Sequence, residues 1–172
     1  GDHFHAVFAP DTPEEYVYEH TDTPASDPHA FQATTRWSTT ATNGSGLGQG
    51  DVTVLTWSIA PDGTDIPGFN GEPQANSDLV AFLGGIYGVV TNDTNYTDEI
   101  WFALFESTFD RWSELTGITY VYEPNDDGAA FSNVSTTAPG VLGVRGDVRI
   151  GGHFIDGNSG VLAYNFFPNN GE

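Results

Sequence analysis

The chain has 172 residues, of which 38% are hydrophobic and 13% aromatic, so it is long enough for one folded domain with a core. It carries 24 acidic residues against 4 Lys and Arg, and this net charge of −20 disfavours nucleic acid and anionic lipid, which bind basic surfaces. Cysteine is absent, which excludes disulfides and thiolate chemistry within the chain, and no apolar run approaches the roughly 20 residues of a membrane span.

Residues 1–50 are predicted to form an extended acidic N-terminal arm or the remnant of a propeptide. They are rich in Pro, Thr, Asp, His and Gly and show no sustained periodicity. Two short apolar patches interrupt them, HFHAVFA at 3–9 and EYVYEH at 15–20, and the glycine-rich stretch 42–50 follows. The folded domain is therefore expected to cover 51–172.

This domain is predicted to begin with a strand at 51–60, where β-branched and aromatic residues cluster. Residues 61–76 have the Pro, Gly, Asp and Asn content of turns. Asp78 is placed to cap a short helix at 79–88, which the adjacent glycines at 84–85 weaken.

The clearest helix is predicted over 98–116. Asp98 and Glu99 stand at its positive end, and Gly117 is expected to end it. Its large apolar residues recur near the 3.6-residue period and therefore define one apolar face. These residues are Ile100, Leu104, Phe105, Phe109, Trp112 and Leu115.

Three further strands are predicted, at 118–123, 146–154 and 161–167. A helix directly between two strands indicates a crossover connection, and hence a partly parallel sheet. The pattern therefore predicts an α+β domain with four strands, one long helix and a short one.

Three segments of this domain together resemble a known family. They are FDRWSELTGITYVYEP, then GDVRIGGHF, then DGNSGVLAYNFFPNNGE, and in this order and spacing they are similar to the front half of the matrixin catalytic domain. Matrixins are secreted zinc endopeptidases of the matrix-metalloproteinase type, and the bacterial secreted members are the most similar. The resemblance covers about residues 50–172 and implies a zincin-like, twisted, mostly parallel sheet with an antiparallel edge strand.

The zinc-binding signature of the family, H-E-x-x-H-x-x-G-x-x-H, is not found in this chain. In the family the signature lies beyond the point that matches Glu172, so the resemblance implies that catalytic zinc belongs to a missing C-terminal part and that 1–172 alone is not catalytic. Where the family has L-A-H-A-F, with a histidine that binds structural zinc, this chain has Tyr164. No structural zinc is therefore expected, and His153 is interpreted as a strand residue whose ring nitrogens have ordinary partners. The chain has five histidines, His3, His5, His20, His29 and His153.

The loop DGNSG at 156–160 is predicted to bind calcium. Calcium prefers six to eight oxygen ligands from carboxylates and backbone carbonyls, and the loop offers an acid and glycines that permit tight folding. The resemblance implies the Asp156 carboxylate and the carbonyls of Gly157, Ser159 and Val161 as ligands. The alternative is a plain turn between strands, and the other two ligands of the family would lie beyond Glu172.

The resemblance also implies how the intact enzyme holds its peptide or protein substrate. The strand that begins at Val161 corresponds to the exposed edge strand, whose free backbone groups would pair with the substrate. The residues implied are Val161, Leu162, Ala163 and Tyr164. The principal hypothesis is thus the N-terminal portion of a secreted zinc metalloendopeptidase, located outside the cell.

The alternative hypothesis is a non-catalytic extracellular subunit on the same scaffold, which assembles into filaments by strand donation. In the family a fifth strand lies between the third and the fourth, and it would follow the loop at which this chain stops. The empty position could be filled by an associated C-terminal fragment, or by residues 3–9 of a neighbouring copy.

The chain contains two weaker motifs. The sequons at Asn43, Asn92, Asn95 and Asn133 give slight support for secretion and leave glycosylation open. The tripeptide at 145–147 spells the Arg-Gly-Asp that integrins bind, but it leads into a predicted strand and is interpreted as a coincidence.

Overall fold

The computed structural model describes residues 37–68, 71–132, 138–155 and 163–165. The chain divides into two units, Gly1–Thr34 and Thr35–Glu172, and everything described belongs to the second. The second unit begins at Thr35, which is 16 residues before the predicted domain start at 51. Residues 37–50, predicted as part of the arm, include Thr40, which is buried.

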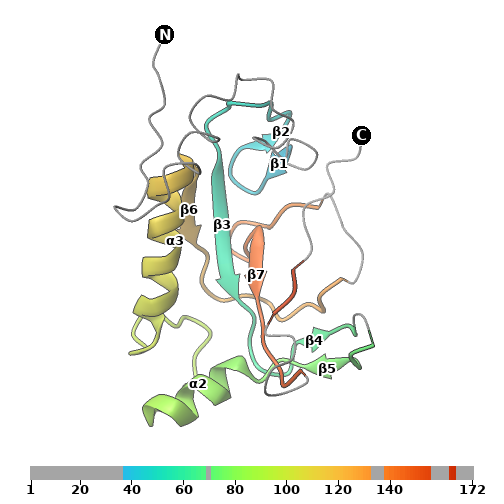
Figure 1. Ribbon diagram of the computed structural model, residues 1–172, viewed down its shortest axis with the longest axis vertical. Coiled ribbons are helices and arrows are strands. Elements are labelled where there is room, and N and C mark those ends of the chain that lie inside the picture. The colour runs from blue at the N-terminus through green and yellow to red at the C-terminus, as the bar shows by residue number, and fades with distance from the viewer. Residues whose placement is uncertain (1–36, 69–70, 133–137, 156–162, 166–172) are drawn as a thin grey trace, which may run out of the picture. The chain divides into compact units, whose positions relative to one another are not determined.

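The centre of the second unit is a parallel sheet of three strands in the order β6–β3–β7 (Figure 1). Strand β3 (Val54–Ile59) pairs with β6 (Thr119–Tyr122) from Val54↔Thr119 to Trp57↔Tyr122. It pairs on its other side with β7 (Val148–Ile150), from Trp57↔Val148 to Ile59↔Ile150. The three predicted strands at 51–60, 118–123 and 146–154 are confirmed in type, with shorter bounds.

Two helices connect β3 to β6. Helix α2 (Leu79–Tyr87) and helix α3 (Phe102–Thr116) follow the predicted order, and both end at a glycine in the left-handed conformation. For α3 this residue is Gly117 (φ 72°), as predicted, and its N–H donates to the Ser113 carbonyl. Helix α3 begins four residues later than predicted, because the preceding residues form turns in which Phe102 N–H donates to the Glu99 carbonyl.

Asp78 does not cap α2 with its side chain, contrary to the prediction. The cap comes from Asp62, which lies eighteen residues before Val80 in the chain. Its Oδ1 accepts the Val80 N–H (2.9 Å) and its Oδ2 accepts the Ala81 N–H (2.8 Å). The backbone carbonyl of Asp78 still accepts the Phe82 N–H, so Asp78 keeps the position of a cap but not its side-chain role.

The apolar core lies between the sheet and the two helices. Trp57 and Ile59 from β3 pack with Trp101 and Phe102, and Trp57 stacks on Phe109 of α3 at a ring-centroid distance of 4.4 Å. Helix α3 thus covers the sheet with aromatic rings, which carry large apolar areas.

The remaining described strands form two short antiparallel hairpins. Strand β1 (Thr39–Thr40) pairs with β2 (Gly44–Ser45), and β4 (Asp65–Ile66) pairs with β5 (Ala75–Asn76). The predicted fourth strand of the main sheet, at 161–167, is not seen in the part that is described. Residues 163–165 form no strand. The antiparallel edge strand is therefore not found in the described ranges.

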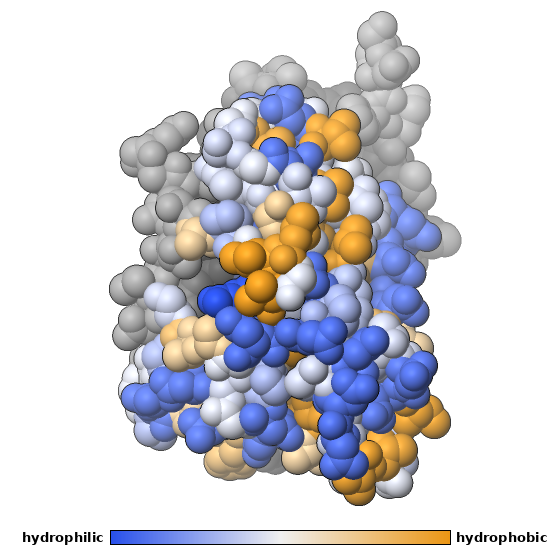
Figure 2. All heavy atoms as spheres, turned by 180° about the vertical axis from the view of Figure 1, so that it is seen from behind, coloured by the Kyte–Doolittle hydropathy of each residue, from blue (hydrophilic) through white to orange (hydrophobic). Residues whose placement is uncertain are grey.

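The molecule is α+β, with two helices and a three-stranded parallel sheet in its described part. Among the described residues, no helix combines the length and hydropathy that a membrane crossing would need. Figure 2 shows one face on which a mostly hydrophilic surface surrounds a central group of hydrophobic side chains.

Candidate functional site

The face of the sheet opposite the helices is polar and yet buried. Side chains alternate along a strand, so Thr56 and Ser58 point away from the face that carries Trp57 and Ile59. Thr56 is 2% exposed and Ser58 is 0% exposed. Loops that follow β6 and precede β7 cover both residues with charged groups, so this face is a candidate site.

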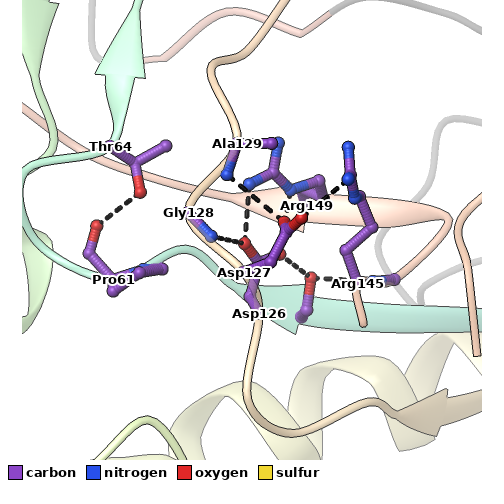
Figure 3. A network of polar contacts seen from close by, with 10 residues as sticks. Pro61, Thr64, Asp126, Asp127, Gly128, Ala129, Arg145 and Arg149 are labelled. Atoms are coloured by element: carbon purple, nitrogen blue, oxygen red, sulfur yellow. Dashed lines mark hydrogen bonds and ion pairs between the residues drawn. The ribbon is translucent and has the colours of Figure 1, made fainter. Parts of the chain in front are cut away.

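Asp126 and Arg149 form a buried ion pair on this face (Figure 3). Arg149 Nη2 donates to Asp126 Oδ1 at 2.6 Å and Arg149 Nε donates to Oδ2 at 2.8 Å, which is a two-pronged contact. The side chain of Asp126 is 0% exposed and that of Arg149 is 12% exposed. Ser58 Oγ donates to Asp126 Oδ2 at 2.6 Å, and the Gly128 N–H donates to Oδ1 at 3.0 Å.

These contacts set the charge state of Asp126. Burial by itself would raise the pKa of this carboxyl, because a buried anion loses its hydration. The hydrogen bonds from Arg149, Ser58 and Gly128 outweigh burial and hold the pKa of Asp126 below its ordinary value. Asp126 is therefore ionised and fully hydrogen-bonded at neutral pH, which suits a structural anion more than a proton donor.

A second, more exposed ion pair lies beside the first (Figure 3). Arg145 Nη2 donates to Asp127 Oδ2 at 2.7 Å, and each side chain is 34% exposed. Arg149 also lies over the ring of Phe131, at 4.6 Å from the centroid. The two arginines next to the sheet are thus each committed to a neighbouring carboxylate.

Asp147 holds three separate segments together. Its Oδ1 accepts the N–H groups of Ala41 and Gly140, each at 2.8 Å. Its Oδ2 accepts the Thr56 N–H at 2.9 Å and the Thr56 hydroxyl at 3.0 Å. Because both oxygens are bound within the chain and Arg145 is paired with Asp127, the tripeptide 145–147 is an internal structural element.

Gly146 is required by the close approach of this segment to β3. Its N–H donates to Ser58 Oγ at 3.0 Å, and an added Cβ would lie 2.7 Å from the Ser58 backbone nitrogen. Any side chain at this position would push the segment away from Ser58 and weaken the network around Asp126.

The predicted calcium residues, Asp156, Gly157, Ser159 and Val161, lie outside the described residues, as does Leu162 of the predicted substrate strand. The other two residues of that strand are described. Ala163 is exposed and in no strand.

Tyr164, also in no strand, donates its hydroxyl to the Pro67 carbonyl at 3.3 Å. This side-chain contact ties the segment to the β4 side of the molecule, and no described strand pairs with it.

His153 lies three residues beyond the end of β7. Its Nδ1 is 2.7 Å from the Phe154 carbonyl, and within the described ranges its buried Nε2 has no hydrogen-bond partner. The interpretation as a histidine with ordinary partners therefore holds for one ring nitrogen and not for the other. Among the described residues, no three His, Cys, Asp or Glu side chains gather where they could hold a metal ion.

An open pocket of about 430 Å³ adjoins α2. Val80, Val89, Val90 and the helix glycines line it, and Asp62 supplies its acid. Both oxygens of Asp62 already accept N–H groups of α2. Thr91 also lines the pocket, and among the described residues its buried hydroxyl has no hydrogen-bond partner.

The sequence interpretation missed the polar face of the sheet. The available signal was the placement of Thr56 and Ser58 at alternate positions of a strongly apolar strand, with Asp126 just after the next strand. Such alternation ordinarily indicates a face in contact with water. No known protein family, curated protein or solved structure matches the chain.

Proposed function

We propose that this chain is the N-terminal portion of a secreted, matrixin-like zinc metalloendopeptidase with a zincin-like sheet. One observation carries the proposal: two of the three segments that resemble the family flank β3 in a single parallel sheet. The first segment forms the end of α3 and β6, and the second contains β7. A helix that leads into a sheet strand is what the resemblance implies for FDRWSELTGITYVYEP.

The described residues do not supply a catalytic zinc site, since no suitable group of His, Cys, Asp or Glu lies among them. No catalytic step is therefore assigned to any residue of this chain. Its role in the intact enzyme is to build the scaffold, and to hold the substrate through the edge strand implied at 161–164. The zinc ligands and the glutamate base of H-E-x-x-H are proposed to follow Glu172.

The encoding gene tests this proposal first, because it either continues into H-E-x-x-H or does not. If it does, the full-length product should cleave an unstructured protein such as casein, and a zinc chelator should stop the cleavage. Replacing the glutamate of the signature by glutamine is the matched inactive control. Residues 1–172 alone should show no chelator-sensitive cleavage. A gene that continues without the signature would contradict the proposal.

A calcium site at Asp156, Gly157, Ser159 and Val161 is part of the proposal. Calcium that binds only the folded state raises stability by about 2.7 kcal/mol at a hundredfold excess over its dissociation constant. Thermal melting of the full-length protein with and without calcium measures this gain, and Asp156→Ala should abolish it. Equal melting temperatures with and without calcium would refute the site and leave the peptidase assignment standing.

One observation favours the alternative, a non-catalytic subunit assembled by strand donation. Strand β7 is an edge strand of the parallel sheet in the described part, so a donated strand could pair with its free edge. Light scattering before and after deletion of residues 1–10 tests whether HFHAVFA is the donor. Unchanged particle size would rule out this donor.

A further inference from the structure

The four asparagines that begin an Asn-X-Ser/Thr tripeptide differ in their structural surroundings. One of them, Asn95, lies in the connection between α2 and α3 (Figure 1). Asn95 is exposed, and so is Thr97, the hydroxyl residue of its tripeptide, whereas Asn133 lies outside the described residues. An exposed tripeptide of this kind on a surface loop is the setting in which secreted proteins receive N-linked oligosaccharide.

The middle residue of this tripeptide anchors the loop. Tyr96 is 1% exposed, and its N–H donates to the Tyr122 hydroxyl at 3.4 Å. The Thr97 hydroxyl donates to Asn95 Oδ1 at 3.0 Å, so the two recognition groups of the tripeptide lie together at the surface. Within the described ranges Asn95 Nδ2, the atom that would receive a sugar, forms no hydrogen bond, and its modification would therefore break none.

Asp93 supplies a further recognition group two positions before the asparagine. It is exposed, and its Oδ1 accepts the N–H groups of Thr94 and Asn95 at 2.6 and 3.0 Å. Its Oδ2 has no hydrogen-bond partner in the described part of the chain and is open to a basic group. Single-subunit bacterial oligosaccharyltransferases require an acid at this position, where it pairs with a basic group of the enzyme. The residues two positions before the other three asparagines are uncharged: Ala41, Val90 and Phe131.

The other two described asparagines belong to contacts between separate segments. The Oδ1 of Asn43 accepts the Val54 N–H at 2.8 Å, which joins the β1–β2 hairpin to the start of β3. In the tripeptide that begins at Asn92, the hydroxyl of Thr94 donates to Asn125 Oδ1 at 2.9 Å. Presenting either tripeptide to a transferase would break such a contact.

We propose that Asn95 is the N-glycosylation site of this chain and receives an oligosaccharide from a polyprenyl diphosphate donor. Its Nδ2 forms a bond to C1 of the first sugar, the C1–O bond to the diphosphate breaks, and the amide nitrogen releases one proton. Asp93 and Thr97 position the acceptor in the transferase. The inference rests on the secreted location in the proposed function, because these transferases act on the outer or lumenal side of a membrane.

Transfer of oligosaccharide to the purified, folded full chain tests the proposal. The chain is incubated with a single-subunit bacterial oligosaccharyltransferase and a polyprenyl-diphosphate-linked oligosaccharide, and intact mass and peptide mapping locate the product. We expect one glycan, attached to Asn95. Asn95→Gln should remove it, and Asn92→Gln, the matched change in the same loop, should leave it in place.

Two variants of nearly unchanged shape test the recognition groups. Asp93→Asn keeps an oxygen that can accept the Thr94 and Asn95 N–H groups but removes the charge, and transfer should fall about tenfold or more. Thr97→Val removes only the hydroxyl and should abolish transfer. Both positions are exposed, so both variants should keep the far-UV circular dichroism of the parent chain.

No transfer to the parent chain, or a glycan that persists in Asn95→Gln, would overturn the proposal. Equal transfer to Asp93→Asn and to the parent chain would refute the role of the acid. The assay does not depend on peptidase activity. A gene without the zinc signature would therefore refute the proposed function and leave a glycan on Asn95 standing, whereas an unmodified chain from a gene with the signature would refute only the site.

Discussion

The two faces of the β6–β3–β7 sheet are buried by different means. The helix side is covered by aromatic rings from α3, with Trp57 at the centre of the contact. The loop side is covered by carboxylates and guanidinium groups that satisfy Thr56 and Ser58. Burial of the helix side requires complementary shape and apolar area. Burial of the loop side requires a hydrogen-bond partner for each buried polar group.

This difference determines how each face tolerates change. An apolar contact that loses a methyl group is weakened in proportion, but a buried charge that loses its partner is left without hydration. The polar face should therefore respond to single substitutions in an all-or-none manner and the apolar face gradually.

The largest effect is expected from Asp126→Ala. The substitution leaves Arg149 charged and nearly buried without its partner, which costs about 3–5 kcal/mol. Urea denaturation followed by circular dichroism measures the loss in the free energy of unfolding. Asp127→Ala is the control at the neighbouring ion pair, because Asp127 and Arg145 share a single hydrogen bond at 34% exposure, and its loss should cost less than about 1 kcal/mol.

The same carboxyl should respond to acid. The folded-state pKa of Asp126 is below its ordinary value of 3.8, so its contribution to stability is complete above that pH and is lost as the pH falls below it. Similar losses for the Asp126 and Asp127 variants at pH 7 would contradict the contrast between buried and exposed pairs.

On the helix side, Phe109→Ala should cost about 2–3 kcal/mol. The ring of Phe109 stacks on Trp57 at 4.4 Å but is partly exposed, so the loss is smaller than for a fully buried phenylalanine. Leu104→Ala on the exposed side of the same helix is the control and should cost less, because Leu104 is 54% exposed and lies about 140° from Phe109 around the helix. If Leu104→Ala were as costly as Phe109→Ala, the division of α3 into a covered and an exposed side would be wrong.

The helix side was largely predictable from the sequence and the loop side was not. The periodicity of 98–116 and the glycine at 117 identify α3, because both are local signals. The Thr56 hydroxyl donates to Asp147, which is 91 residues away in the sequence. The Ser58 hydroxyl donates to Asp126, which is 68 residues away. No local pattern marks such pairs, and the polar residues of β3 were therefore not expected to be buried.

The faces of α3 illustrate the same limit. Periodicity identified its apolar residues but could not tell that the sheet covers Phe105 and Phe109 and leaves Leu104 exposed. In the described part the sheet has three short strands, and which residues of α3 it covers is a property of the fold rather than of the helix. The predicted site residues from 156 to 162 lie outside the described residues, so their roles stay predictions.

Alkaline pH should test the helix side through Tyr96. This residue is 1% exposed, and burial, with further effects from Tyr122 and nearby acids, raises its pKa from 10.0 to about 12. Between these values the unfolded state loses the proton first, so stability is complete below pH 10 and declines above it, by up to about 2.7 kcal/mol. The decline should be shallower in Tyr96→Phe, measured by urea denaturation from pH 9 to 12, and parallel curves would contradict this assignment.

The smallest effect is expected at Asp62, the carboxylate that caps α2. Asp62 caps α2 through the Val80 and Ala81 N–H groups, so Asp62→Ala should cost about 1 kcal/mol. Asp78→Ala removes the same charge at the position that the sequence favours, but its side chain makes no cap bond, and the change should stay within about 0.5 kcal/mol. Because both variants lose one negative charge, the difference between their unfolding free energies isolates the cap from the general charge effect. Equal losses, or a larger loss for Asp78→Ala, would show that Asp78 and not Asp62 caps α2, as the local sequence predicts.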